Sequence, residues 1–201
     1  MFPLPVVLFP EELLPLHIFE ERYKQMIGEC LDGSLPFGVV LAEESGFRQI
    51  GCSARIVEVV QKFSDGRMNI VIQGEDRFLI LQTHQEKPYL TADVEFFEDA
   101  REEAPSGDLV DEVVQAFQAV GGETDSPSGD PPEDPTRLSF RIGAALGLPL
   151  RDKQELLEND SLGERLHHLV RMIEGKKHRV EQVSRQQKSA IRNGHPKKPD
   201  S

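Results

Sequence analysis

The chain lacks long apolar runs, has few cysteines and has a deficit of basic residues, and each shortage excludes a class of protein. No uninterrupted run of about 18 apolar residues occurs, which excludes a membrane-spanning helix. The only two cysteines, Cys30 and Cys52, lie too far apart for a CxxC motif, so we expect two reduced core thiols and no zinc knuckle. Lys and Arg total 23 against 35 Asp and Glu, a net charge of −12 that repels phosphate backbones and anionic lipid.

Motifs that carry catalysis are also missing from the sequence. There is no GxxxxGK[ST] phosphate loop, no GxSxG elbow and no HExxH pair. His167 and His168 are adjacent on an expected helix, so they point about 100° apart and do not chelate one metal together. Spacing alone leaves a Ser–Lys dyad open, although no serine lies in a Gly-rich strand–turn–helix context. We therefore predict that the chain is not an enzyme and has no catalytic residue, metal ligand or cofactor.

The first ten residues are apolar, yet they do not form a secretory signal. No basic residue precedes them, three prolines lie within them, and Glu11 and Glu12 follow directly. Together with the reduced thiols, this favours a cytoplasmic location.

Residues 1–100 are expected to form a β-rich subdomain. Apolar residues from Ile18 to Leu31 recur at helical spacing, whereas 36–42, 52–63, 68–73, 77–81 and 89–97 have the character of short strands. Asp65-Gly66 supplies a hairpin turn, and Gly74 marks an expected bend. One helix with five or six short strands predicts a small closed or nearly closed β-barrel.

Residues 105–193 are expected to form a helical subdomain. Helices are predicted at 108–120, 137–146 and 153–157, followed by a long helix that Ser161 and Glu164 open with a capping box. We expect a mobile acidic loop at 121–135 and a disordered tail at 194–201. The long helix should project a basic end into solvent, formed by Lys176, Lys177, Arg179, Arg185, Lys188 and Arg192. The predicted fold class is α+β, a small barrel followed by a helical bundle.

An ordered series of motifs resembles one known family over about residues 2–173. The series runs Phe2–Pro10, Leu14–Tyr23, Phe37–Leu41, Gly51–Ile56, Asp65–Arg67, Gly74–Phe78, Pro88–Ala92, Lys153–Glu158 and Leu162–Leu166. It resembles the N-terminal, substrate-binding domain of Lon proteases. Two departures are that Glu21 replaces a common proline and that the chain begins abruptly at the first motif.

The resemblance implies a PUA-like barrel with a helical bundle, in a free-standing form without the ATPase and peptidase domains. The implied function is a non-catalytic, adaptor-like module that binds unfolded or flexible polypeptide segments, with a protease or a chaperone as a further partner. Neither nucleic acid nor a membrane is expected as a partner, and the oligomeric state is left open.

Candidate residues fall into two sets. The stiff, apolar Phe2–Leu16 stretch is the expected polypeptide-binding edge, through Phe2, Leu4, Val6, Leu8, Phe9, Leu14 and Leu16. The residues of the family motifs are expected to be structural: Phe19, Phe37 and Phe78 as core anchors, and Glu20, Arg22, Arg67 and Arg77 as the members of ion pairs that close the barrel. The whole second set is His17, Phe19, Glu20, Arg22, Tyr23, Gly38, Gly51, Asp65, Gly66, Arg67, Gly74, Arg77, Phe78, Pro88 and Tyr89.

Two alternatives stay open at this point. An RNA-binding PUA-like protein would use the basic end of the long helix, although the net charge opposes that function. A hydrolase would need a site that no motif in the sequence provides.

Overall fold

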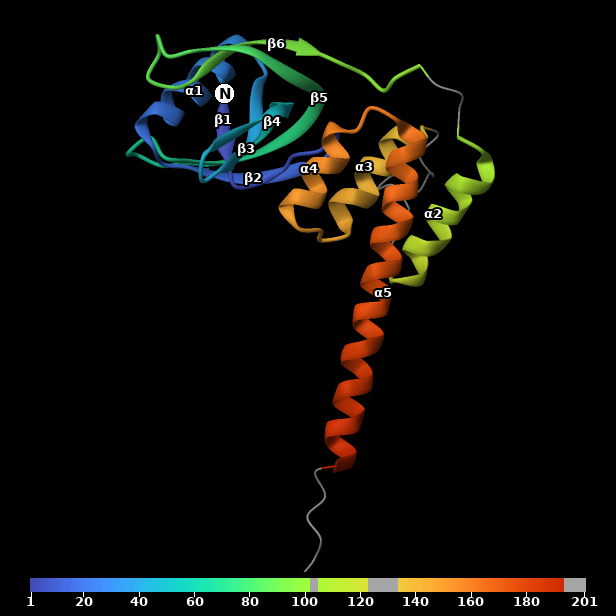
Figure 1. Ribbon diagram of the computed structural model, residues 1–201. Helices are drawn as coiled ribbons and strands as arrows, with labels where there is room; N and C mark the ends of the chain where they lie inside the picture. The colour runs from blue at the N-terminus through green and yellow to red at the C-terminus, as the bar shows by residue number, and fades with distance from the viewer. Residues whose placement is uncertain (102–104, 123–133, 194–201) are drawn as a thin grey trace, which may run out of the picture.

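The computed structural model describes residues 1–101, 105–122 and 134–193, with side chains as far as 178 (Figure 1). The strand-rich half contains β1 Phe2–Leu4, β2 Leu13–Ile18, α1 Glu21–Gly33, β3 Phe37–Glu43, β4 Gly46–Lys62, β5 Met68–His84 and β6 Thr91–Phe96. The helical half contains α2 Gly107–Ala119, α3 Pro135–Ala145, α4 Leu150–Glu158 and α5 Leu162–Asn193. The predicted α+β class is confirmed, and Figure 1 shows α2, α3 and α4 around the first part of α5, which then extends away from the body.

The six described strands form one open sheet. Its order is β1-β3-β4-β5-β2, and β6 also pairs with β5; β1 runs parallel to β3 and all other pairs are antiparallel. The strands β4 and β5 each have 17 residues and pair with different strands at their two ends. β3 pairs with residues 46–54 of β4, and β6 pairs with residues 78–84 of β5. At the other end, β2 pairs with residues 68–73 of β5. Three register shifts between β4 and β5 bend the pair, as β-bulges do. The sheet therefore curves without closing, and the closed form of the expected barrel is wrong.

Glycines allow close backbone contact inside this sheet. A Cβ at Gly74 would collide with the carbonyl group of Phe9, and one at Gly51 would collide with the carbonyl oxygen of Val39. β5 continues through Gly74, the expected bend, with a register shift between Gly74 and Arg77, and Gly74 also contacts the N-terminal segment. Gly66 has a φ of +83° in the predicted Asp-Gly hairpin turn, which only glycine adopts readily.

Each half of the chain has its own hydrophobic core. In the strand half, α1 packs Tyr23, Met26 and Ile27 against the buried face of β5. In the helical half, a separate core joins α2, α3, α4 and the first part of α5. Val7 and Phe9 belong to the helical core, whereas Leu8 between them belongs to the strand core. The N-terminal segment therefore connects the two halves by burial.

The helix starts follow local capping chemistry. The hydroxyl of Ser161 accepts a hydrogen bond from the Glu164 amide at 3.3 Å, which confirms the predicted N-cap of α5. Asp134 caps α3 by accepting from the Thr136 amide at 2.9 Å, and Pro135 is the first helical residue. The last two positions of the predicted 121–135 loop thus belong to the start of α3, while 123–133 and the predicted tail lie outside the described residues.

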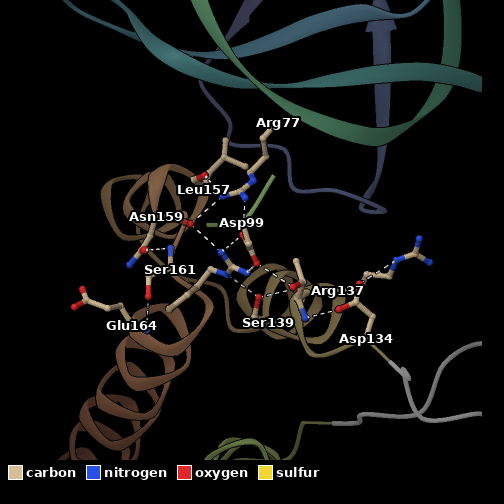
Figure 2. A network of polar contacts seen from close by, with 11 residues as sticks. Arg77, Asp99, Asp134, Arg137, Ser139, Leu157, Asn159, Ser161 and Glu164 are labelled. Carbon is tan, nitrogen blue, oxygen red and sulfur yellow. Dashed lines mark hydrogen bonds and ion pairs between the residues drawn. The ribbon is translucent and has the colours of Figure 1, made fainter. Parts of the chain in front are cut away.

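A buried polar network joins the two halves (Figure 2). Asp99, just after β6, accepts hydrogen bonds from Arg77 of β5 at 2.5 Å and from Arg165 of α5 at 2.8 and 2.5 Å. Arg165 is fully buried and Arg77 almost so. Both guanidinium groups also donate to the Asn159 carbonyl oxygen at 2.8 Å, and Arg165 donates to the Ser139 hydroxyl at 2.8 Å. We call Arg77, Asp99 and Arg165 the junction triad.

The junction triad should make stability depend on pH in the acid range. Burial by itself raises the pKa of Asp99, but the hydrogen bond and charge of Arg165, with the charge of Arg77, hold it below its usual value. A carboxyl whose folded pKa is depressed stabilises the fold fully above its unfolded pKa of about 3.9, and that contribution is lost as pH falls through the folded pKa. We expect the free energy of unfolding to fall below about pH 4, and to fall less steeply in Asp99→Asn. Urea titrations at several pH values measure both slopes, and equal slopes would contradict the assigned charge of Asp99.

Candidate polypeptide-binding surface

The distal part of the sheet is a three-stranded ribbon. It consists of β2, residues 68–73 of β5 and residues 55–62 of β4. The inward side chains of β5, Met68, Ile70 and Ile72, are buried in the core with α1. The side chains between them, Asn69, Val71 and Gln73, must then point outward, because neighbouring residues of a strand face opposite sides.

Large apolar side chains are exposed on the outer side of this ribbon. Leu13 is 60% exposed and Val60 is 57% exposed, and Val57 is also exposed. Exposed Pro15 pairs with half-buried Val71 at the centre of the ribbon. We define the ribbon face as Leu13, Pro15, Val57, Val60 and Val71. Interaction sites commonly carry exposed apolar side chains, so the ribbon face is the candidate site.

The strand pattern explains why these residues gather on one side. Along β2 the exposed positions alternate with half-buried ones up to Ile18, so Leu13, Pro15 and His17 share the outer side. On β4, register shifts occur between Ile56 and Glu58 and between Val59 and Gln61. Each shift places two residues opposite one on β5, which brings Val57 and Val60 out beside their polar neighbours.

Aromatic and polar groups border the ribbon face at its hairpin end. The His17 ring lies 5.9 Å from the ring of Phe19 and 6.3 Å from that of Phe63. His17 also shares a hydrogen bond of 2.6 Å with the Asn69 side chain, and the guanidinium of Arg67 lies 5.1 Å above the Phe63 ring. A polar rim around an apolar centre is the usual anatomy of a protein interface.

The predicted binding edge at Phe2–Leu16 is partly wrong. Phe2, Leu8 and Phe9 are buried, because Phe2 and Leu8 fill the strand core and Phe9 fills the helical core. The other four predicted residues, Leu4, Val6, Leu14 and Leu16, are half-buried and pack against the strand core. The exposed residues of this segment are Pro5, Glu11, Leu13 and Pro15. The prediction missed Leu13 and Pro15, although the alternation of β2 pointed to them.

The family-motif residues are mostly structural in position. Phe37 and Phe78 are buried, as expected of core anchors, and Tyr23 and Tyr89 are buried too. Gly38 and Gly51 lie too close to the Phe78 ring to carry a side chain. Phe19 is a correction, because 59% of it is exposed beside His17. Pro88 is exposed at the turn before β6.

The predicted ion pairs across the barrel are also corrected. Arg22 pairs with nearby Glu20 at 2.8 Å, and Arg67 pairs with Asp65 of its own turn at 2.7 Å. Arg77 instead points toward the helical half, into the junction triad. Sequence neighbours supply the first two partners, so these pairs do not hold distant strands together.

The described residues contain no grouped metal ligands, and both cysteines among them are buried. Among residues 1–101, 105–122 and 134–193, no group of three or more His, Cys, Asp or Glu side chains is arranged to hold a metal ion. In that same part of the chain, no helix combines the length and apolar character needed to cross a bilayer. Both cysteines are buried free thiols, and burial raises the pKa of Cys52 to about 12, so it stays protonated and unreactive.

The basic end of α5 is described only in part. Lys176 donates to the Leu146 carbonyl oxygen at 2.8 Å and thereby binds the end of α3, and Lys177 is exposed. The side chains of Arg179, Arg185, Lys188 and Arg192 lie outside the described residues. The RNA-binding alternative therefore gains no support from the structure.

The chain thus combines an open, curved sheet, a helical bundle and an exposed apolar face on the ribbon. The chain belongs to the ATP-dependent protease La (LON) substrate-binding domain family, whose model matches residues 1–175. This confirms the resemblance drawn from the motifs.

The curated relatives are larger proteins, and the match covers only one part of each. The chain is 24% identical to the Lon protease of Cytophaga hutchinsonii over 186 residues, covering 84% of this chain and 23% of that protein. It is 26% identical to the Lon protease of Escherichia coli K12 over 190 residues, with coverage of 84% and 23%. The chain thus spans about a quarter of the length of the curated relatives it matches.

Solved structures show the same fold. A Lon N-terminal domain protein from Xanthomonas campestris matches with a TM-score of 0.66 and 23% identity, covering 84% of this chain and 94% of that one. The N-terminal domain of the Mycobacterium avium complex Lon protease matches with a TM-score of 0.66 and 18% identity, covering 87% and 96%.

Proposed function

We propose that this chain is a non-catalytic module that binds exposed apolar segments of unfolded or flexible polypeptides through the ribbon face. The observation that carries the proposal is the group of exposed large aliphatic side chains on the ribbon of β2, β5 and β4. The family description, a substrate-binding domain, supports the same function.

The energetics suit weak and unselective recognition. Burying one Val or Leu side chain contributes about 1.5–3 kcal/mol, and the loss of translational and rotational freedom offsets much of the sum for a face of this size. Affinity should therefore lie near the micromolar range, as suits a module that captures and releases many chains. The net charge of −12 adds repulsion toward acidic chains and favours neutral or basic ones.

The region that the family model matches supports a role in recognition without catalysis. The family model describes a substrate-binding domain, and the relatives named Lon protease are about four times longer than the matched part. We propose an adaptor-like role, in which a protease or a chaperone acts on the bound chain. The two protonated, buried thiols agree with the cytoplasmic location that the sequence favours.

Calorimetry at several salt concentrations tests the proposed function. Titration with an unfolded, carboxymethylated model protein should give a Kd in the micromolar range. The Kd should change by less than about threefold from low to high salt, because apolar contact is not screened. Binding to a polyelectrolyte would instead weaken by orders of magnitude over the same range. Absence of binding heat at micromolar concentrations, or a collapse of binding with salt, would refute the proposal.

A further inference from the structure

A separate apolar cavity lies in the strand half, away from the ribbon face. Its volume is about 290 Å³, and it opens between α1, the start of β3 and β6. Its wall is formed by Met26 and Cys30 of α1, Phe37 of β3, Phe78 of β5, and Ala92 and Val94 of β6. This volume is at the lower end of the range for small-molecule sites, so it suits one or two large side chains.

The mouth of the cavity is apolar and exposed. Leu35, in the loop after α1, is 58% exposed, and Phe96, at the end of β6, is 56% exposed; both line the cavity. Two large apolar side chains at the entrance of an apolar cavity mark a place where a partner side chain gains by leaving water.

A fixed polar group closes one side of the mouth. The Tyr89 hydroxyl and the Lys87 ammonium both donate to one Glu29 oxygen at 2.5 Å, which ties the loop before β6 to α1. The hydrogen bond from Lys87, with that from Tyr89, lowers the pKa of Glu29 to about 2. Glu29 is therefore charged and already paired with Lys87, so this rim is a preformed wall.

The free edge of β6 runs along the cavity. Within the described part of the chain, β6 pairs with β5 alone, and its second edge has no strand partner. Ala92, Val94 and Phe96 face the cavity, whereas Asp93 and Glu95 between them are exposed. An extended segment added to this edge would alternate in the same way, with every second side chain toward the cavity and the others beside these two carboxylates.

We propose that the cavity and the β6 edge form a second, sequence-selective site for a short extended polypeptide segment in which large apolar residues alternate with basic ones. The apolar residues enter the cavity past Leu35 and Phe96. The basic residues pair with Glu95 and with exposed Asp93, whose carboxylate also lies 3.0 Å from the His84 ring, since opposite charges on adjacent strands stabilise each other. This site is independent of the ribbon face and differs from it in requiring a charge pattern.

The absence of tryptophan from the chain supplies a direct readout. A peptide that alternates tryptophan and leucine with lysine is the probe, because its emission is free of protein tryptophan signal. We expect saturable binding with a blue shift of the emission as the indole enters the cavity. A matched peptide with glutamate in place of lysine should bind at least tenfold more weakly at low salt. Binding without a blue shift, or equal binding of both peptides, would overturn the proposal.

Variants locate the peptide on the molecule. Ala92→Phe fills the cavity. Leu35→Ser removes apolar surface from the mouth of the cavity and replaces an exposed residue. Each variant should bind the lysine peptide at least tenfold more weakly. Ala100→Phe and Leu81→Ser are the matched controls, since both positions are exposed and neither lines the cavity. They should bind like the unmodified chain.

The ribbon face provides the last comparison. The double variant Leu13→Ser/Val60→Ser should leave the blue shift and Kd of the lysine peptide unchanged, so failure of one site is distinguished from failure of the other. If Ala92→Phe fails to fold, Leu35→Ser still decides the matter. If Leu35→Ser binds the lysine peptide as tightly as the unmodified chain, or if Leu81→Ser loses as much affinity as Leu35→Ser, the cavity is not the binding site.

Discussion

Replacing Asp99 with alanine should destabilise the chain by about 3–5 kcal/mol, the usual effect of breaking a buried ion pair. Asp99 is the carboxylate that Arg77 and Arg165 share, and its removal would leave two buried guanidinium groups without a counter-charge. The Asn159 carbonyl and the Ser139 hydroxyl would still accept hydrogen bonds, but neither carries a negative charge. Because the triad joins β5, the segment after β6 and α5, we expect the two halves to lose mutual stabilisation.

Chemical denaturation measures this effect, and Asp93→Ala is its control. The Asp93 carboxylate lies at 3.0 Å from His84 with 68% of its side chain exposed, so its loss should cost less than about 0.5 kcal/mol. If the halves separate before unfolding, the denaturation curve of Asp99→Ala should broaden or split into two transitions. A loss below about 1 kcal/mol in Asp99→Ala would show that the triad is not a buried connection.

Replacing Phe9 with alanine should cost about 3–5 kcal/mol, because it empties a fully buried aromatic site. The Phe9 ring stacks on Phe140 of α3 at 5.6 Å between centroids, and a Cβ added at Gly143 of α3 would lie 3.4 Å from the ring. The Lys153 ammonium lies 5.7 Å above the ring. Phe9 thus fixes the N-terminal segment to the helical half.

Phe19→Ala is the matched control for Phe9→Ala. Phe19 is the exposed aromatic residue beside His17, and its loss should change the free energy of unfolding by less than about 0.5 kcal/mol. Thermal and urea unfolding of both variants measure how much more stability is lost at the buried position than at the exposed one. A near-unchanged stability of Phe9→Ala would contradict the burial of Phe9 and favour the exposed position predicted from the sequence.

The regular elements were largely predictable because local signals define them. Helical spacing located α1, and the Asp65-Gly66 turn located the β4–β5 hairpin. Ser161 located the start of α5. These features depend on neighbours within a few positions, which a sequence displays directly.

The binding surface was less predictable because it depends on which side of a strand faces the core. The N-terminal segment is apolar almost throughout, so composition does not separate buried Leu8 and Phe9 from exposed Leu13. That separation comes from contacts with α3 and β5, far along the chain. Likewise, Arg77 was expected in ion pairs across the barrel, whereas its partner Asp99 lies among many acidic residues that look alike in sequence.

The most direct test of the central claim is the affinity of the Leu13→Ser/Val60→Ser variant for an unfolded model protein, measured by calorimetry beside the Leu150→Ser control. Leu13 and Val60 are exposed on the ribbon face, and Leu150 is exposed at the start of α4, so all three substitutions should preserve the fold. Losing two aliphatic contacts should weaken binding at least tenfold, and Leu150→Ser should bind like the unmodified chain. Equal affinities for all three proteins would contradict binding through the ribbon face.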